Sequence, residues 1–505
     1  MQALRKALAT GLRPSPASLA LIRGSASQAG DQSVLPLKTG RPRLVILGTG
    51  WGGAALARDI DPKRFDLTII SPRNHMVFTP LIASSCVGTL EPRSVTVPIT
   101  DIQPALRLPQ NQFLVAECDA VHPKDRLVEC RSKTDGLKFF VEYDILAIAT
   151  GSQGSTFGIP GVTQFTMPLR DAANSTDIRT RLIQNWGESN LPGRDPAERA
   201  RLLHVAIVGG GPTGVEFAGE LADFMQRDLY KIDPNRARDM RITLIEADQL
   251  LASFDPSLRE FAARKLTRAG VHLVKGIVKE VRERELELKN GTVIPYGLCV
   301  WSTGVGPTMF SLGLPFEKTM RGRLAVNDQL RALLRHAEGR GPTSLEDVSM
   351  VQEEAAAAGQ PTGRPAHRVY GLGDIATTQD NPLPPLAQVA EQQGRYLART
   401  LNEAAAKAAG KQPDEKGRHP LELALAEAQP FAYKHLGSMA SVGGKDAVLE
   451  LGEKGAKRHV NWAGFLSWLA WRSAYLTRLG TMKHRFYVMT DWTMSLIFGR
   501  DVSKW

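Results

Sequence analysis

The sequence predicts an α/β fold with two Rossmann-like dinucleotide-binding domains, followed by a C-terminal region of amphipathic helices. Glycine-rich turns at 48–53 and 209–214, each between an apolar run and a helix-forming run, predict the paired domains. Aromatic and basic residues recur through 461–500, which predicts the third region.

The first glycine-rich turn lies in "RLVILGTGWGGAALARDI" and contains Gly48, Gly50 and Gly53. Such a turn needs a sharp bend, bare backbone for a diphosphate and close packing of helix on strand. The diphosphate then sits at a helix N-terminus, where free N–H groups favour negative charge. The next apolar run, 65–72, predicts a second strand. An acidic residue usually ends that strand and binds a ribose hydroxyl; here Ser71 stands there and would form the same bond more weakly.

The second turn lies in "VAIVGGGPTGVEFAGEL" and contains Gly209, Gly211 and Gly214. The strand that follows, "RITLIEA", ends at Glu246. A carboxylate there binds the 2′-hydroxyl of NADH and repels the 2′-phosphate of NADPH, so we expect a preference for NADH. The alternative is that Glu246 simply ends a surface strand.

Three further apolar strands end in turn residues: "YDILAIATGSQ", "LCVWSTGV" and "HRVYGLGDIA", which carry Thr150-Gly151, Thr303-Gly304 and Gly373-Asp374. The order of all five segments resembles that of flavoproteins with two dinucleotide sites. That resemblance implies that the first and last segments line an FAD site, with Asp374 bound to the ribityl chain. It implies that the middle segment serves NADH.

These motifs predict a discontinuous FAD domain, built from 42–160 and 306–430, with an NADH domain at 161–305 inserted into it. An Ala-, Gly- and Glu-rich stretch at about 332–366 is expected to be a surface excursion without a calcium-binding pattern. Residues 431–505 form the predicted membrane-association region.

Composition places the chain among globular proteins: it has 505 residues, 43% of them hydrophobic, and a net charge of +11. The charge gathers at the two ends, so nothing indicates nucleic-acid binding. The first thirty residues carry four basic residues and no acidic one, which is typical of an organelle transit peptide within 1–40. We expect the mitochondrion, peripheral on the matrix side of the inner membrane. The alternative location is the stromal side of the plastid thylakoid. The alternative interpretation of the segment itself is a disordered N-terminal tail.

The four cysteines are widely spaced and contain no CxxC pair: Cys86, Cys118, Cys130 and Cys299. The sequence therefore predicts no disulfide framework, no metal site of the zinc-module type and no redox-active dithiol.

The C-terminal region has no apolar run long enough to span a bilayer. One helical face carries Trp468, Trp471, Tyr475 and Leu479, and basic residues lie nearby at Arg472, Arg478, Lys483 and Arg485. This pattern is typical of an interfacial anchor on an anionic membrane surface. The alternative is a helical pair that packs on the body of the protein or on a second copy.

With these motifs placed, the chain resembles the type II NADH dehydrogenases, in their organellar, inward-facing form, over about 42–505. The segments that carry the resemblance include "SPRNHMVFTPLI", "VWSTGVGP", "PLAQVAEQQG" and "WRSAYLTRLGTMKHRFYVMTDWTMSLIFGRD". The resemblance implies hydride transfer from NADH to non-covalent FAD, then two-electron reduction of a membrane quinone without proton pumping. It also implies a homodimer.

The resemblance also assigns site residues. Gln388 and Gln392 line the quinone site, and Tyr475 reaches it. Glu216 sits by the flavin and the nicotinamide. Further residues lie beside the flavin: Thr79, Pro80 and, by a weaker match, Lys434. Without the resemblance, exposed helix positions would be the default for both glutamines and for Glu216.

Two other enzyme classes share this scaffold. A sulfide:quinone oxidoreductase needs a cysteine late in the chain, and none follows Cys299. A disulfide reductase needs a dithiol motif. An NADH-sensing flavoprotein of the apoptosis-inducing-factor type is the non-catalytic alternative, against which "AQVAEQQG" and the amphipathic tail count.

Overall fold

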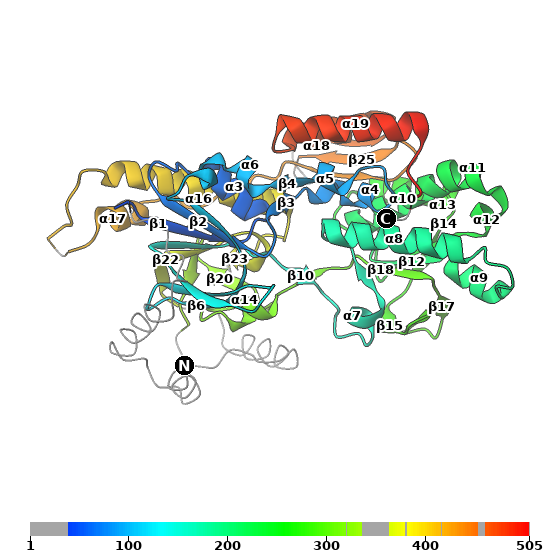
Figure 1. Cartoon of the computed structure of the whole chain (residues 1–505), viewed down its shortest axis with the longest axis horizontal. Coiled ribbons are helices and arrows are strands. Elements are labelled where there is room, and N and C mark those ends of the chain that lie inside the picture. The colour runs from blue at the N-terminus through cyan, green and yellow to red at the C-terminus, as the bar shows by residue number, and fades with distance from the viewer. Residues whose placement is uncertain are drawn as a thin grey trace.

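The computed structural model describes residues 39–503 except 320, 336–362, 379–380, 416 and 453–459. The predicted transit segment therefore lies almost wholly outside the described residues, as does most of the predicted excursion. Figure 1 shows two lobes side by side, with a pair of long helices lying across one face where the lobes meet.

The first lobe is built on an eight-stranded sheet in the order β23-β20-β21-β22-β9-β1-β2-β5. The strands from β22 to the edge strand β5 pair in parallel. The strands span Ala376–Thr378 (β23), Leu324–Val326 (β20), Arg331–Leu333 (β21), Pro365–Gly371 (β22), Ile145–Ile148 (β9), Arg43–Leu47 (β1), Asp66–Ser71 (β2) and Gln112–Val115 (β5).

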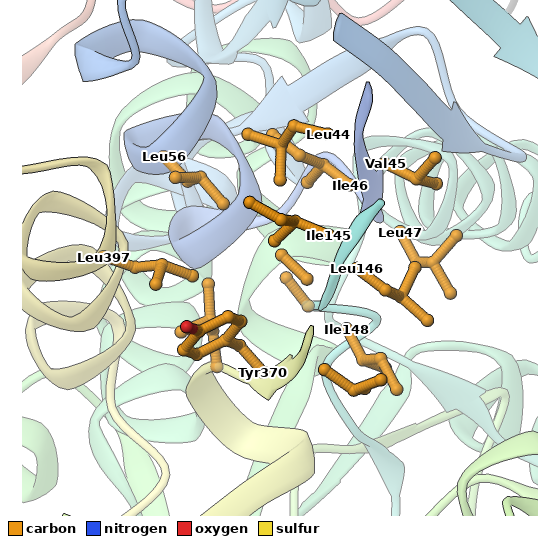
Figure 2. Close-up of a cluster of buried hydrophobic side chains, with 14 of the residues drawn as sticks. Leu44, Val45, Ile46, Leu47, Leu56, Ile145, Leu146, Ile148, Tyr370 and Leu397 are labelled. Carbon is orange, nitrogen blue, oxygen red and sulfur yellow. The ribbon is translucent and has the colours of Figure 1, made fainter. Parts of the chain in front are cut away.

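Helices α3 (Trp51–Asp59) and α16 (Ala387–Ala408) pack against each other beside this sheet. Figure 2 shows the core that results, where side chains of β1 and β9 meet Leu56 of α3, Leu397 of α16 and Tyr370 of β22. All of them are almost fully buried. The unbroken apolar runs of these strands are what a parallel sheet covered on both faces requires.

The second lobe holds a parallel five-stranded sheet in the order β11-β18-β12-β13-β14. Its strands span Met167–Pro168 (β11), Leu298–Trp301 (β18), His204–Val208 (β12), Arg241–Glu246 (β13) and Val271–Lys275 (β14). Helices α8 (Ala172–Glu188), α9 (Pro196–Leu202), α10 (Pro212–Phe224), α12 (Pro234–Asp239) and α13 (Pro256–Arg268) surround it.

Several of these helices begin where the sequence offers an aspartate before the first turn. Asp171 accepts the Ala173 N–H at 3.1 Å to cap α8. Asp255 accepts the Ser257 N–H at 2.9 Å to cap α13, and Pro256 follows at the first helical position. Local chemistry thus sets the starts of these helices.

A short antiparallel ribbon joins the two lobes, formed by β10 (Gln153–Gly154) and β19 (Val305–Gly306). These are the two points at which the chain passes between the sheets, so both passages run side by side through the centre of the molecule (Figure 1).

The C-terminal region adds a three-stranded sheet and two helices: β24 (Ser438–Ser441), β25 (Ala447–Leu451), β26 (Val460–Gly464), α18 (Phe465–Arg478) and α19 (Met482–Phe498). It docks on α10 by backbone contact, because a Cβ on Gly219 would lie 2.7 Å from the Gly443 nitrogen. Only glycine permits this approach.

The aromatic stripe of α18 faces inward, not toward a membrane. Trp471 is 4% exposed and Leu479 1% exposed, and they pack with Phe78 of the first lobe. Of the nearby basic groups, Arg472 stacks between Trp468 and Trp492, at 4.1 and 4.3 Å from the ring centres. For this stripe the alternative prediction, packing on the body, is therefore the correct one. Helical periodicity identified a face but not its direction.

A different set of side chains makes the outer face of α18 and α19. Large apolar residues there are half or more exposed: Phe465, Leu466, Leu469, Met482, Phe486, Met494, Leu496, Ile497 and Phe498. Arg478 and Lys483 are exposed as well. Within the described residues, no helix has the length and apolarity needed to cross a bilayer.

The end of the chain is held by a buried ion-pair cluster. Arg500 donates to Asp228 Oδ2 at 2.8 Å and to Glu220 Oε2 at 3.0 Å, and all three side chains are at most 15% exposed. Its Nε also donates to the Thr89 hydroxyl at 2.7 Å. Arg500, two residues after the end of α19, is thereby fixed to α10 and to the segment that follows α4 (Ile82–Ser85).

Smaller elements complete the fold. An antiparallel sheet, β6 (Glu117–His122), β7 (Leu127–Arg131) and β8 (Lys138–Glu142), belongs to the first lobe, and another, β15 (Val278–Val281), β16 (Glu285–Leu288) and β17 (Val293–Pro295), to the second. The others include β3 (His75–Val77), β4 (Thr96–Pro98), α5 (Pro92–Val95), α6 (Ile99–Ile102), α7 (Val162–Phe165), α11 (Tyr230–Ile232), α14 (Met309–Gly313) and α17 (Pro420–Ala426).

Candidate active site

One cavity of about 1820 Å³ is lined by residues of both lobes and of the C-terminal region. Of the residues expected at the sites, its lining includes Gly48, Gly50, Ser71, Thr79, Pro80, Thr150, Gly151, Gly211, Glu216, Thr303, Gly304, Gly373, Asp374, Gln388 and Tyr475. The cavity lining does not include Gly53, Gly209, Gly214, Glu246, Gln392 and Lys434.

In the first glycine-rich turn each glycine meets a separate demand. Gly48 has φ +98°, and a Cβ on it would lie 2.5 Å from the Ala149 carbonyl oxygen. A Cβ on Gly53 would lie 2.0 Å from the Gly48 oxygen, so only glycine lets α3 pack on β1. A Cβ on Gly50 would meet nothing within 4 Å. Its surroundings are open space at the N-terminus of α3, where no side chain caps the helix.

The second turn repeats this pattern. Gly209 has φ +111° and lies against the Ser302 backbone, and a Cβ on Gly214 would lie 2.0 Å from the Gly209 oxygen. Gly211, at the uncapped N-terminus of α10, has open space around it. Each turn therefore brings a helix N-terminus without a side-chain cap to the cavity, which is the arrangement that binds a diphosphate.

At the end of β2 the Ser71 hydroxyl lies 3.1 Å from that of Thr49 and accepts the Arg73 N–H at 3.3 Å. Arg73 also lines the cavity and forms an ion pair with Asp171, the cap of α8. Burial acts to raise the pKa of Asp171, but Arg73 and the Ala173 N–H together hold that pKa below its ordinary value. A residue of the second lobe thus holds a cation of the first, a link that sequence spacing does not reveal.

Glu246 ends β13 and turns back onto the second glycine-rich turn. Its Oε2 accepts the Gly210 N–H at 2.5 Å, and its Oε1 accepts the Asp248 N–H at 3.0 Å. The carboxylate is therefore held beside the turn that would carry the dinucleotide.

Asp374 lies at the cavity wall with its Oδ2 accepting the Ser152 hydroxyl at 2.8 Å. Arg170 donates to the same hydroxyl at 3.0 Å, and burial lowers the pKa of its guanidinium. Close by, the hydroxyl of Thr150 is buried and has no hydrogen-bond partner among the described residues. A buried hydroxyl of this kind is an acceptor or donor that a bound group would satisfy.

Glu216 is the most strongly perturbed carboxyl group of the cavity wall. Burial raises its pKa to about 8, against the ordinary 4.5, although the Ser441 N–H donates to it at 3.2 Å. Tyr475 lies next to it, and burial, with a smaller effect of the Glu216 charge, raises the pKa of that phenol. Its ring stands edge-on to Trp471 and to Phe78, at 5.1 and 5.8 Å between ring centres.

Comparison with known proteins now bears on these residues. The family described as pyridine nucleotide-disulphide oxidoreductase matches residues 42–336, and the NDH2 C-terminal domain matches 435–501. The internal alternative NAD(P)H-ubiquinone oxidoreductase A1 of Arabidopsis thaliana is 42% identical, over 93% of this chain and 87% of its own. A probable NADH dehydrogenase of Dictyostelium discoideum is 34% identical, over 92% and 91%.

The chain belongs to the type II NADH dehydrogenases.

A solved structure of NDH2 from Plasmodium falciparum in complex with NADH has the same fold. It is 23% identical, with a TM-score of 0.77, and the match covers 92% of this chain and all of the other. A sulfide:quinone oxidoreductase from Aquifex aeolicus has a related fold, with a TM-score of 0.59 at 16% identity. The predicted fold class is thus confirmed. The sulfide enzyme has a related fold, but this chain belongs to a different family.

Among these dehydrogenase residues the two glutamines of α16 behave alike. Gln388 donates to the Gly437 carbonyl and accepts the Leu436 N–H, both at 3.1 Å. Gln392 donates to the Lys434 carbonyl at 2.8 Å and accepts its N–H at 3.0 Å. Both carboxamides hold the backbone of 434–437 as a neighbouring strand would, but Gln388 alone of the two lines the cavity.

The remaining expected residues are placed less centrally. Thr79 accepts the Trp51 indole N–H at 3.1 Å, which fixes the loop that carries Pro80 at the cavity wall. The side chain of Lys434 is exposed, outside the cavity lining. Sequence reasoning missed Arg73, Arg170 and Asp171; the polar run that follows "MPL" was the available signal, but nothing in it indicates a contact with β2.

Proposed function

We propose that this chain oxidises NADH and reduces a membrane quinone of the ubiquinone type, with FAD as its resident cofactor, on the matrix side of the mitochondrial inner membrane. The observation that carries the proposal is that both glycine-rich turns and Glu216 border the same cavity. A donor and an acceptor reaching one cavity can share one redox cofactor.

The residues of the first lobe fit FAD. The open space at Gly50, the uncapped start of α3 and the unpartnered Thr150 hydroxyl are what a dinucleotide with a diphosphate would fill. Asp374 would bind the polar ribityl chain. When bound, FAD accepts a hydride and passes on two electrons, and the protein contributes position and polarity.

The residues of the second lobe fit NADH. Gly211 and α10 would hold its diphosphate, and Thr303 and Gly304 border the same cavity. Glu246, already fixed at the end of β13, would accept a ribose hydroxyl and disfavour a phosphate there. We infer that 161–305 acts as the NADH domain and that 42–160 with 306–430 acts as the FAD domain.

Quinone reduction consumes two protons, and Glu216 is placed to hold one. With a pKa near 8 it is protonated at neutral pH, within a wall that Tyr475 and Gln388 also form. A protonated carboxyl can donate to an oxygen that gains electrons. We assign Gln388 and Tyr475 to the quinone end of the cavity and Glu216 to proton delivery there.

The outer face of α18 and α19 supplies the route from the membrane. Its exposed apolar residues, with Arg478 and Lys483 beside them, form the kind of surface that rests on an anionic leaflet. We propose that this face lies on the membrane, in place of the inward stripe of Trp471 and Leu479. The homodimer that the resemblance implies stays a separate proposal.

Anaerobic stopped-flow spectroscopy of the purified, FAD-loaded protein tests the proposed reaction. We expect NADH to bleach the flavin absorbance, a soluble short-tail quinone to restore it, and sulfide to do nothing. A flavin that NADH bleaches but quinone does not restore would instead support an NADH-sensing role. A flavin that sulfide bleaches would support the sulfide enzyme.

Flotation with phospholipid vesicles tests the membrane face. We expect Leu466→Glu with Phe498→Glu to abolish flotation with anionic vesicles, while Ser473→Glu, an exposed change on α18, lowers it little. Flotation of the double variant at the wild-type level would exclude the face. Sedimentation velocity of both variants in detergent then tests the homodimer: a dimer lost only in the double variant would assign the same face to a second copy.

A further inference from the structure

Two of the four cysteines, twelve residues apart in the chain, lie opposite each other in the sheet β6-β7-β8. Cys118 of β6 and Cys130 of β7 are Cα partners in the antiparallel register. Directly opposed residues project to the same face with their Cβ atoms about 4.5–5.5 Å apart. A disulfide spans Cβ atoms about 3.5–4.5 Å apart, so a small approach of the strands closes one.

The ladder between the two strands is irregular next to this pair. The register shifts between Cys118 and Ala120, so a bulge adjoins the cysteine pair. A bulge interrupts the ladder and permits local bending. Both cysteines are free thiols in this structure.

The two cysteines differ in access. Cys130 is fully buried in the core of the first lobe, whereas Cys118 is half-buried and lines the large cavity together with Glu117, Asp119 and Arg131. A reagent in the cavity therefore meets Cys118 first, and Cys130 stands behind it. The neighbouring Cys130 thiol and burial raise the pKa of Cys118, which keeps Cys118 as a thiol and makes its oxidation slow.

The pair borders the part of the cavity where the first dinucleotide would place its adenosine. Strand β5 pairs with β2, and the Ala116 N–H, two residues before Cys118, donates to the Ser71 carbonyl at 3.3 Å. Ser71 ends the strand at which a ribose hydroxyl is expected. A ligand in this position would cover Cys118.

We propose that Cys118 and Cys130 form an oxidation site that is open in the FAD-free protein and covered when FAD is bound. The proposal rests on the proposed function, because FAD must occupy the first lobe. On this proposal, the disulfide between Cys118 and Cys130 forms in protein molecules that lack FAD. Because the sequence has no CxxC motif, it predicted no redox-active dithiol. The register of β6 and β7 nevertheless brings these two thiols together.

The oxidant is a small disulfide, such as oxidised glutathione. The Cys118 thiolate attacks one of its sulfurs, a mixed disulfide forms, and one glutathione thiolate leaves and takes a proton. Cys130, as thiolate, then attacks the Cys118 sulfur and releases the second glutathione. Two thiols lose two electrons and two protons, and one glutathione disulfide becomes two glutathione molecules.

Peptide mass spectrometry tests the site directly. Wild-type protein, FAD-depleted or FAD-saturated, is treated with oxidised glutathione, alkylated under denaturing conditions and digested with trypsin. Cleavage after Lys124 and Arg126 places the two cysteines on separate peptides. We expect the linked pair of peptides in the FAD-depleted sample and its suppression in proportion to the FAD bound, which flavin absorbance measures independently.

Two variants sharpen the result. Cys130→Ser should stop at the mixed disulfide on Cys118, and Cys86→Ser with Cys299→Ser should leave the linked peptides unchanged. If linked peptides form equally in the FAD-saturated sample, the claim that FAD covers Cys118 is wrong. If the wild-type protein keeps glutathione on Cys118, the claim that Cys130 forms a disulfide with it is wrong. A protein that binds no FAD, yet links its cysteines, would contradict the proposed function and the covering but not the pair.

Discussion

Gln392 and Lys434 hold each other by two hydrogen bonds, and Gln388, one turn earlier on α16, holds Leu436 and Gly437 in the same way. The two glutamines are thus a matched pair that differ in one respect, because Gln388 borders the cavity and Gln392 does not.

Comparing variants of these two glutamines distinguishes a structural role from direct contact with the quinone. We expect Gln388→Leu and Gln392→Leu each to lower the free energy of unfolding by about 1–3 kcal/mol, because each removes two hydrogen bonds. Gln388→Leu should in addition raise the KM for quinone and slow reoxidation of the flavin in stopped flow, with its reduction by NADH unchanged. Equal quinone kinetics in the two variants would remove Gln388 from the quinone site.

The raised pKa of Glu216 makes stability depend on pH. The folded protein keeps the proton up to a pKa of about 8, whereas the unfolded chain loses it near 4.5. The stabilisation is complete below the lower value and falls as the pH rises through the higher one, by up to about 1.4 kcal/mol per pH unit. Denaturant unfolding at several pH values should show this decline in the wild type and a flatter profile in Glu216→Gln. Parallel profiles would mean that the carboxyl titrates normally.

Glu246 should set the choice of dinucleotide. Glu246→Gln removes the negative charge and the bond from the Asp248 N–H, but it keeps one oxygen that can accept the Gly210 N–H of the turn. We expect the ratio of kcat/KM for NADH to that for NADPH to fall about tenfold or more, equivalent to ~1.4 kcal/mol. An unchanged ratio with unchanged stability would place the ribose elsewhere.

The glycines of the first turn should fail in different ways. Gly53→Ala drives a Cβ into the Gly48 oxygen and should destabilise the fold by at least about 2 kcal/mol. Gly50→Ala meets no atom of the protein, so the FAD-free variant should unfold within about 1 kcal/mol of the wild type. It should nevertheless bind FAD at least about tenfold more weakly. Full FAD affinity in Gly50→Ala would show that no diphosphate lies against this turn.

Much of the fold follows from local patterns. The expected strands at 43–47, 204–208 and 241–246 are all present, since a short apolar run next to turn residues favours a buried strand. The turns themselves were predictable in part because Gly53 and Gly214 each lie against the carbonyl oxygen of the glycine five residues earlier, which is a local steric requirement. The order of motifs along the chain then indicated the family.

What escaped prediction depends on contacts distant in sequence. The Arg73–Asp171 pair and the opposition of Cys118 and Cys130 arise from strand register and lobe packing, which no spacing rule encodes. Trp471 and Leu479 show the same limit in another form. An apolar helical face is equally suited to a bilayer and to a protein core, and only the partner surface, here Phe78 and its neighbours, decides between them.

The ion-pair cluster at Arg500 makes the end of the chain important for the packing of the second lobe. Cutting the chain before this residue would leave the buried carboxylates of Glu220 and Asp228 without their cation. Helix α10, which follows the second glycine-rich turn, would then lose its ion-pair link to the end of α19. A truncation to Gly499 should therefore weaken the packing of α19 against the second lobe.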